Sequence, residues 1–323
     1  MALVSGSGRG IGKEIASKLA ADGAKVVVND LDADVAEETV AELTTSGAEA
    51  VACAGNVTDA DFGEKFVAAA LDNFGGLDII VNNAGYTWDN VIQKTTDEQW
   101  YAMLDVHMTA PFRIMRAAAD HFRAAAKAEA EAGQEVYRKV VNISSLAGVG
   151  GNAGQIGYGA AKAGVTGMTR VMAKEWGRFK VNVNAVAFGL IRTRLTEASA
   201  GTGAITVGEK EIKVGVNPEV MKSLEAGIPL GRGGTPAEAA GAVYCSASRI
   251  RLHQRPDRCG QRRLHVLSRS RPFTKEYTHE HRRFTAREPG RVRPERTCPA
   301  RRESRVRQRR VGCCRAGHSG HPA

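Results

Sequence analysis

Cysteine is scarce in most of this 323-residue chain, and long apolar runs are absent. Residues 1–248 contain only Cys53 and Cys245, so no disulfide framework is expected. The later cysteines lack the spacing of a metal site, so no metal is expected either. No apolar run approaches the ~20 residues that a membrane helix needs, and no basic segment precedes the apolar start at Ala2 to Val4. We therefore expect a cytoplasmic protein without a signal peptide or membrane contact.

Lysine is almost absent from residues 249–323, where 21 of the 22 basic side chains are arginine. With six acidic residues, this segment has a net charge of +16, whereas residues 1–248 have a net charge of −6. The whole-chain charge of +10 thus averages an acidic body and a basic tail. A solvated surface has no reason to exclude lysine. A frame-shifted reading of GC-rich codons would favour arginine over lysine, because every CGN codon encodes arginine.

The tail composition leads to the hypothesis of a frameshift near Cys245. An allowed set of codons for residues 251–263, read one nucleotide downstream, encodes Asp-Tyr-Ile-Ser-Gly-Gln-Thr-Val-Val-Val-Ser-Gly, which reads as a turn, a strand and a glycine stop. As written, the segment has no apolar period. We expect one domain over residues 1–245 and an unstructured, Arg-rich tail over 246–323. The alternative, which we do not favour, is a basic tail that binds nucleic acid.

Strand and helix signals alternate along the first 190 residues. Continuous apolar runs such as Val26 to Val28 are typical of strands buried on both faces of a sheet. Between such runs apolar residues recur at helical spacing, as at Ile11, Ile15 and Leu19. Parallel strands need crossover connections, so the alternation predicts a doubly wound parallel sheet, a three-layer α/β/α Rossmann-like fold. The expected strands are 2–4, 25–30, 50–53, 77–81, 139–143 and 181–187, and the expected helices are 11–21, 35–43, 62–74, 98–107, 111–132 and 158–176.

Two stretches depart from this alternation. Ala117 to Gly133 is rich in Ala and Glu and predicts a long helix with an exposed, solvated end. From Leu195 to Gly227 the periodicity fades, and Gly and Ser become common. In a doubly wound fold such a stretch lies above the carboxyl ends of the strands, where it forms either a substrate lid or a plain surface loop.

A glycine-rich loop, Ser5-Gly6-Ser7-Gly8-Arg9-Gly10-Ile11-Gly12, joins the first strand to the first helix. Glycine lets the backbone turn sharply and approach a pyrophosphate, and the helix start presents free N–H groups. Asp30, at the end of the second strand, can accept hydrogen bonds from the adenosine ribose and would repel a 2′-phosphate. Arg9 instead favours NADP, because its guanidinium could pair with the 2′-phosphate. We therefore prefer NAD and keep NADP as the alternative.

Further motifs follow this loop in order: Asn82-Asn83-Ala84-Gly85, then Ser145, then Tyr158-Gly159-Ala160-Ala161-Lys162. With the loop spacing Ser-Gly-x-x-x-Gly-Ile-Gly, they resemble the short-chain dehydrogenase/reductase family over residues 1 to about 245. The run Pro229-Leu230-Gly231-Arg232 is similar to members related to 3-oxoacyl-[acyl-carrier-protein] reductases and 3-hydroxyacyl-CoA dehydrogenases. The resemblance implies an NAD(P)-dependent oxidoreductase that forms a homodimer or homotetramer, and a frameshifted tail would impair that assembly.

Tyr158 and Lys162 lie four residues apart on one helix face. A lysine ammonium there would stabilise the phenolate and lower the pKa of Tyr158, while Ser145 would hold the substrate oxygen. We expect hydride transfer between nicotinamide and the carbon of a 3-oxoacyl or 3-hydroxyacyl thioester, with Tyr158 as acid/base. The alternatives are an alcohol, sugar or steroid dehydrogenase of the same family, and a non-catalytic fold whose basic tail binds nucleic acid.

The resemblance also has departures. His107 stands where the family commonly has Asn. Its carbonyl could hold the family's catalytic water, its ring could add a group that titrates near neutral pH, or it could simply pack. Ala187-Phe188-Gly189 replaces the usual Pro-Gly, and Asn56 replaces an Asp beside the adenine. The residues expected to bind the cofactor are Gly6, Arg9, Gly10, Ile11, Gly12, Asp30, Asn56, Val57, Asn82, Ala84, Gly85, Tyr158, Lys162, Gly189, Ile191 and Thr193, and the expected catalytic residues are Ser145, Tyr158, Lys162 and His107.

Overall fold

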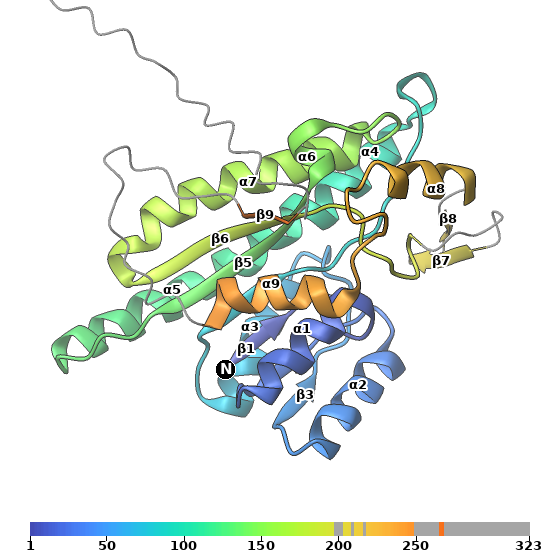
Figure 1. Cartoon of the computed structure of the whole chain (residues 1–323). Helices are drawn as coiled ribbons and strands as arrows, with labels where there is room; N and C mark the ends of the chain where they lie inside the picture. The colour runs from blue at the N-terminus through green and yellow to red at the C-terminus, as the bar shows by residue number, and fades with distance from the viewer. Residues whose placement is uncertain (197–202, 208–209, 216–217, 249–264, 268–323) are drawn as a thin grey trace, which may run out of the picture. The chain divides into compact units, whose positions relative to one another are not determined.

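The computed structural model in Figure 1 describes residues 1–196, 203–207, 210–215, 218–248 and 265–267. A parallel sheet has the strand order β3-β2-β1-β4-β5-β6-β9. The strands are β1 Ala2–Val4, β2 Val26–Val28, β3 Ala50–Ala52, β4 Ile79–Asn82, β5 Arg138–Ser145, β6 Val181–Phe188 and β9 His265–Leu267. The order changes direction between β1 and β4, the kind of point at which doubly wound sheets bind ligands. The predicted fold class is confirmed.

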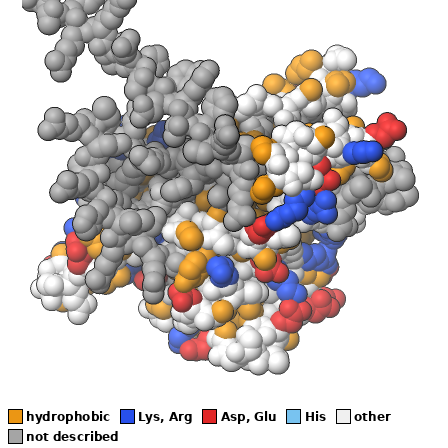
Figure 2. Space-filling view, viewed as in Figure 1, with side chains coloured by type: hydrophobic (Ala, Val, Ile, Leu, Met, Phe, Trp, Pro, Cys, Tyr) orange, Lys and Arg blue, Asp and Glu red, His pale blue; other side chains and the backbone are white. Residues whose placement is uncertain are grey.

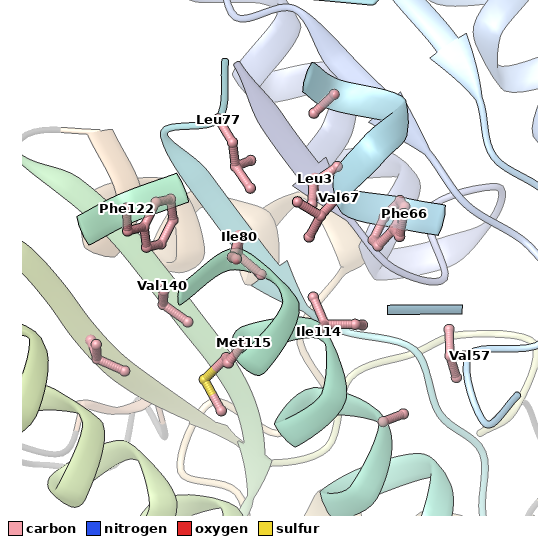
Figure 3. Close-up of a cluster of buried hydrophobic side chains, with 14 of the residues drawn as sticks. Leu3, Val57, Phe66, Val67, Leu77, Ile80, Ile114, Met115, Phe122 and Val140 are labelled. Carbon is pink, nitrogen blue, oxygen red and sulfur yellow. The ribbon is translucent and has the colours of Figure 1, made fainter. Parts of the chain in front are cut away.

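One face of the sheet is covered by α3 (Phe62–Phe74), α4 (Asp97–Leu104), α5 (Ala110–Glu131) and α7 (Ile156–Trp176). Side chains alternate between the faces of a strand, so Leu3 points to this side while its neighbours point to the other. Figure 3 shows Leu3, Ile80 and Val140 of the strands among Phe66 and Ile114 of the helices. This apolar layer is fully buried and fixes the helices against the sheet.

The opposite face is covered by α1 (Gly10–Ala21), α2 (Ala33–Thr45) and α9 (Pro236–Ser248). Here Val4, Val28 and Val141 of the strands pack against apolar residues of these helices. Figure 1 shows α1 and α9 side by side over the sheet. Because both faces are covered, the strands are apolar on both sides, as their sequences predict.

The stretch after β6 contains structure that the sequence did not predict. Residues Gly203–Val207 (β7) and Lys210–Val214 (β8) form an antiparallel hairpin, and α8 spans Pro218–Ala226. Both lie within the expected lid region, and Arg192 is tied to α8 by hydrogen bonds of 3.0 and 2.6 Å to Glu225. The short elements are η1 Ile92–Lys94, the π-helix η2 Asp105–Thr109, α6 Leu146–Gly150 and η3 Gly177–Phe179.

The expected exposed end of the long helix is wrong in one respect. Glu129, in the last turn of α5, receives two hydrogen bonds of 2.9 and 2.6 Å from the guanidinium of Arg138, the first residue of β5. The side chain of Arg138 is only 6% exposed, and its Nε also donates to the carbonyl oxygen of Leu77. The helix end is therefore anchored to the amino-terminal side of the sheet rather than solvated along its length.

The described part of the C-terminal region differs from two expectations. Helix α9 continues through Ser248, three residues beyond the expected domain boundary. Strand β9 pairs with Val186–Phe188, so β6 is not an open edge there, and His265–Leu267 are structured. The other residues of the predicted tail, 249–264 and 268–323, lie outside the described residues. The frameshift stays a prediction.

The described surface and helices give three further observations. Figure 2 shows acidic and basic side chains intermingled over the described part of the face that carries α1, α2 and α9. Among the described helices, none is long and apolar enough to cross a membrane. In the same residues, no cluster of three His, Cys, Asp or Glu side chains is placed to hold a metal ion.

Candidate active site

A cavity of about 780 Å³ lies at the carboxyl ends of the strands on both sides of the β1–β4 switch point. This volume is within the roughly 300–1,000 Å³ of typical ligand sites. It is lined by residues from the loops after β1, β2, β3, β4 and β6 and by the β7–β8 hairpin. Among the residues predicted to bind the cofactor, it brings together Gly6, Arg9, Gly10, Ile11, Gly12, Asp30, Asn56, Val57, Ala84, Gly85 and Thr193.

The glycine-rich loop forms a narrow turn at the floor of this cavity. Gly6 and Gly10 have φ angles of 61° and 56°, the left-handed region that favours glycine. A Cβ on Gly12 would collide with the carbonyl oxygen of Gly6, so a larger residue there would break the turn. Helix α1 begins at Gly10, so its unpaired N–H groups and positive dipole end lie at the cavity. The loop therefore suits the pyrophosphate of a dinucleotide, as predicted from its glycines.

Asn83, rather than Asn82, holds this loop from β4. The side-chain amide of Asn83 donates hydrogen bonds of 3.0 Å to the carbonyl oxygens of Ser5 and Gly6, and Asn83 lines the cavity. Asn82, which we predicted for the site, is buried in the sheet and donates at 2.7 Å to Oδ1 of Asn142. It does not line the cavity, because successive residues of a strand point to opposite faces.

Acidic residues dominate the end of β2. Asp30 lies beside the loop: a Cβ on Gly8 would be 2.6 Å from its Oδ2. Its Oδ1 accepts a hydrogen bond from the backbone N–H of Asp32. Arg9 forms an ion pair of 3.0 Å with Asp32, and both side chains are about half exposed. The guanidinium expected to favour a 2′-phosphate therefore already has a carboxylate partner.

The predicted catalytic residues meet at the start of α7. Ser145 ends β5 and hydrogen bonds to the hydroxyl of Tyr158, which lies in the first turn of α7. Lys162 follows one turn later, with its Nζ 5.6 Å from the centre of the Tyr158 ring. Its ammonium donates a hydrogen bond of 2.8 Å to the carbonyl oxygen of Ile143. The spacing of four residues thus places both side chains on one face, as predicted.

The pKa values differ from the expectation. Burial raises the pKa of Tyr158 above 10; its hydrogen bond with Ser145 opposes this, and the charge of Asp89 adds to it. Burial lowers the pKa of Lys162 to about 7. The net direction for the pKa of Tyr158 is thus upward, opposite to the expectation from its spacing to Lys162, because desolvation is the largest cause.

His107 packs against the same tyrosine. It lies in the π-helix η2, and its ring meets the Tyr158 ring edge-on at 5.0 Å. Its Nε2 lies 2.8 Å from the carbonyl oxygen of Tyr86, so this nitrogen carries the proton, while Nδ1 is buried without a partner. Burial, reinforced by the charge of Lys162, lowers the pKa of His107 well below 6.5. The suggestion that His107 titrates near neutral pH is therefore wrong.

The loop after β6 contributes part of what we expected. Thr193 lines the cavity, and its methyl group is 3.9 Å from the position of a Cβ on Gly10. Ile191 instead pairs with Gly234 in a bridge, and neither Ile191 nor Gly189 lines the cavity. Tyr158 and Lys162 do not line this cavity, but the His107 ring that meets Tyr158 also lies against Gly85 of the lining. The lining residues that sequence reasoning missed are Asn29, Leu31, Asp32, Gly55, Asn83, Tyr86, Val106, Arg194, Leu195, Ala204 and Thr206.

Comparison with known proteins agrees with this arrangement. Residues 1–202 match the family model of short chain dehydrogenases. The chain belongs to this family. A 3-oxoacyl-[acyl-carrier-protein] reductase from Synechocystis is 38% identical over 244 residues, which cover 75% of this chain and 87% of the relative. A hydroxyacyl-CoA dehydrogenase, ChsB1, from Mycobacterium tuberculosis is 43% identical over 191 residues, 58% of this chain and 59% of the relative.

A solved structure also supports membership of the short chain dehydrogenase family. A short chain dehydrogenase from Mycobacterium avium has a TM-score of 0.54 and 41% identity, and the match covers 58% of this chain and 67% of that one. Family membership makes this protein an NAD(P)-dependent oxidoreductase, and its glycine-rich cleft fits a nicotinamide dinucleotide.

Proposed function

We propose that this protein interconverts a 3-oxoacyl thioester and the corresponding 3-hydroxyacyl thioester. The observation that carries the proposal is the position of Tyr158, which hydrogen bonds to Ser145, lies one turn from Lys162 and stands beside a dinucleotide-sized cleft. The names of two relatives support the substrate class, because one is a 3-oxoacyl reductase and the other a hydroxyacyl-CoA dehydrogenase. Their acyl carriers differ, so what they share is an acyl thioester with an oxo or hydroxyl oxygen, and the name of the reductase places that oxygen on the third carbon.

Each catalytic residue has a separate role in this proposal. The glycine-rich loop would hold a nicotinamide cofactor, which would supply the hydride for the carbonyl carbon. Tyr158 donates its phenolic proton to the carbonyl oxygen, so the ketone becomes an alcohol and the tyrosine becomes a phenolate. Ser145 donates a hydrogen bond that holds the same oxygen in place. Lys162, as an ammonium, stabilises the phenolate until a proton returns from solvent.

The pKa of Tyr158 bears on the direction of reaction. Burial raises this pKa above 10, so the phenol is protonated at neutral pH and ready to act as an acid. Ketone reduction uses this form directly. Alcohol oxidation needs the phenolate, so we expect the oxidation rate to rise as the pH increases from neutral toward 10, whereas reduction should not gain.

For the cofactor we propose NAD in preference to NADP. Asp30 and Asp32 both line the cavity at the end of β2, where a 2′-phosphate would meet their negative charges. Arg9 is the neighbouring cation, and its ion pair with Asp32 leaves it less able to hold that phosphate. We therefore expect a lower KM for NADH than for NADPH.

The test is a rate assay with purified full-length chain, run in parallel with a chain whose reading frame is restored after Cys245. NADH and NADPH oxidation would be followed with acetoacetyl-CoA and acetoacetyl-[acyl-carrier-protein], and with simple ketone, sugar and steroid substrates for comparison. The proposal expects the thioesters to have the highest kcat/KM and NADH to be preferred. A sugar or steroid ketone that exceeds both thioesters in kcat/KM would overturn the substrate class.

A further inference from the structure

Asp89 brings a carboxylate close to Tyr158 from a separate part of the chain. Its Oδ2 accepts a hydrogen bond of 2.6 Å from Nε2 of Gln155. Gln155 is the N-cap of α7 and precedes Tyr158 by three residues, so their side chains lie about one helical turn apart. The hydrogen bond therefore holds the Asp89 carboxylate on the residue one turn before the phenol that we propose as the proton donor, and its charge acts on that phenol.

The surrounding contacts keep Asp89 in this position. Nδ2 of Asn152 donates to Oε1 of Gln155 at 2.9 Å, so the Gln155 amide is fixed at both of its ends. The backbone N–H of Asn90 donates to the carbonyl oxygen of Gly154, also at 2.9 Å. The segment that follows β4 is thus fastened to the segment that precedes α7.

The Asp89 residue is exposed, and its charge acts on the Tyr158 hydroxyl. The residue as a whole is exposed to solvent, although partial burial of its carboxyl group raises the pKa of Asp89. Its described partners are the side chains of Gln155 and Thr87, which are neutral. Its charge reaches the Tyr158 hydroxyl, where it disfavours a second negative charge.

We infer that Asp89 is a specificity-determining residue that rejects substrates with a carboxylate close to the reacting carbonyl. In a free 3-oxo acid, one methylene separates the carboxylate from the carbonyl carbon that must reach Tyr158. In an ester or thioester the same position is uncharged. Like charges forced together disfavour one ligand selectively, which is a common means of specificity. The inference rests on the proposed function and narrows it to neutral 3-oxoacyl esters and thioesters.

The experiment compares two probes of the same shape near the carbonyl, ethyl acetoacetate and acetoacetate. Their dissociation constants would be measured by ligand-observed NMR with the full chain saturated with NAD⁺, so that no turnover is needed. The variant Asp89→Asn keeps an oxygen that can accept the Gln155 hydrogen bond and removes only the charge. Coulomb repulsion across a partly hydrated site predicts that acetoacetate gains about three- to tenfold in affinity relative to the ester.

Two further variants separate this effect from others. Asp89→Glu keeps the charge and should keep the wild-type ratio of the two constants. Asp72→Asn removes an exposed charge near the end of α3, which leads into the amino end of β4, whereas the site lies at the carboxyl ends of the strands; it should also leave the ratio unchanged.

The inference is wrong if Asp89→Asn binds NAD⁺ normally and its ratio stays at the wild-type value. It is also wrong if Asp72→Asn changes the ratio as much, since net charge would then be the cause. If the wild-type chain binds NAD⁺ but neither probe, the proposed substrate class fails and the inference fails with it. A working wild-type protein with an unchanged Asp89→Asn ratio would leave the proposed function standing.

Discussion

Burial of Lys162 makes its charge unfavourable for the folded state. Its pKa falls from 10.5 to about 7 because the ammonium loses solvent. Between pH 7 and about 10 the unfolded chain therefore binds a proton that the folded chain does not hold. The free energy of unfolding rises with pH wherever the unfolded state binds more protons. The contribution of this residue thus grows more favourable from pH 7 toward 10 and is least favourable below pH 7.

Lys162→Met is therefore expected to stabilise the protein most at low pH. Removing a buried charge should raise the free energy of unfolding by about 1–3 kcal/mol at pH 6. The gain should shrink by pH 9, where wild-type Lys162 is mostly neutral when folded. Urea unfolding of both proteins at the two pH values measures this. A gain that stayed constant or grew with pH would contradict the account.

His107→Asn is expected to keep turnover within severalfold of wild type. The imidazole is neutral throughout the working pH range, and its Nε2 hydrogen bond to Tyr86 is the contact that an Asn amide can replace in kind. The pH profile of kcat/KM between pH 6 and 9 should therefore keep its shape. A new titration step, or a loss of a hundredfold or more, would mean that the ring takes part in proton transfer.

At the scale of single residues, the types of the site residues could be predicted from the sequence, but the positions of some of their side chains could not. The motifs identified Ser145, Tyr158 and Lys162, and the structure brings these three together. Asn83, and not the predicted Asn82, contacts the glycine-rich loop, because one step along the chain reverses the side-chain direction. The pKa of Tyr158 could not be predicted from the sequence, because the four-residue spacing shows that Lys162 is near but not how deeply Tyr158 is buried.

At the scale of the element, α5 depends on a contact at its end. Arg138 and Glu129 form a two-bonded ion pair, with side chains 6% and 18% exposed. Removing Glu129 leaves the buried guanidinium of Arg138 with only the Leu77 carbonyl and a longer contact of 3.8 Å to Asp78. Glu129→Ala should therefore lower the free energy of unfolding by about 2–4 kcal/mol.

The matched control for this change is Glu131→Ala, two residues further along the same helix. Glu131 forms a long, exposed contact of 3.9 Å with Lys127, so its loss should cost about 0.5 kcal/mol or less. Chemical unfolding of the three proteins tests the comparison. Equal effects from the two substitutions would show that the Arg138 pair does not hold the helix.

Regular elements were predictable where the apolar period was strong. Strands β1, β2 and β4 and helices α1 and α3 agree with their predicted positions to within a few residues. The β7–β8 hairpin was not predicted because its two strands are only five residues long and lie in a stretch where the apolar period fades. The π-helix was also missed, since its extra residue per turn leaves no mark on composition.

At the scale of the whole molecule, the edge of the sheet at β6 is only partly covered. Strand β9 covers only Val186–Phe188 of β6, and among the described residues Val181–Ala185 have no strand on that side. Exposed strand edges favour irregular aggregation of chains rather than a defined oligomer. A frame restored after Cys245 would supply the run Thr-Val-Val-Val, which suits an edge strand.

We therefore predict that the frame-restored chain is more stable and assembles as a homodimer or homotetramer, whereas the chain as given assembles poorly. Thermal unfolding and light scattering of the two proteins would measure both properties, and resequencing the gene near the Cys245 codon would test the cause. An unaltered gene together with an orderly oligomer of the present chain would count against the frameshift.

The claim on which the rest depends is that Tyr158 transfers the proton while the cleft beside it holds the dinucleotide. The direct measurement is acetoacetyl-CoA reduction by Tyr158→Phe, with NADH binding measured separately. We predict that kcat falls by about 10²–10⁴-fold while the dissociation constant for NADH changes by less than about threefold. A phenylalanine variant that reduces the thioester at the wild-type rate would contradict the account.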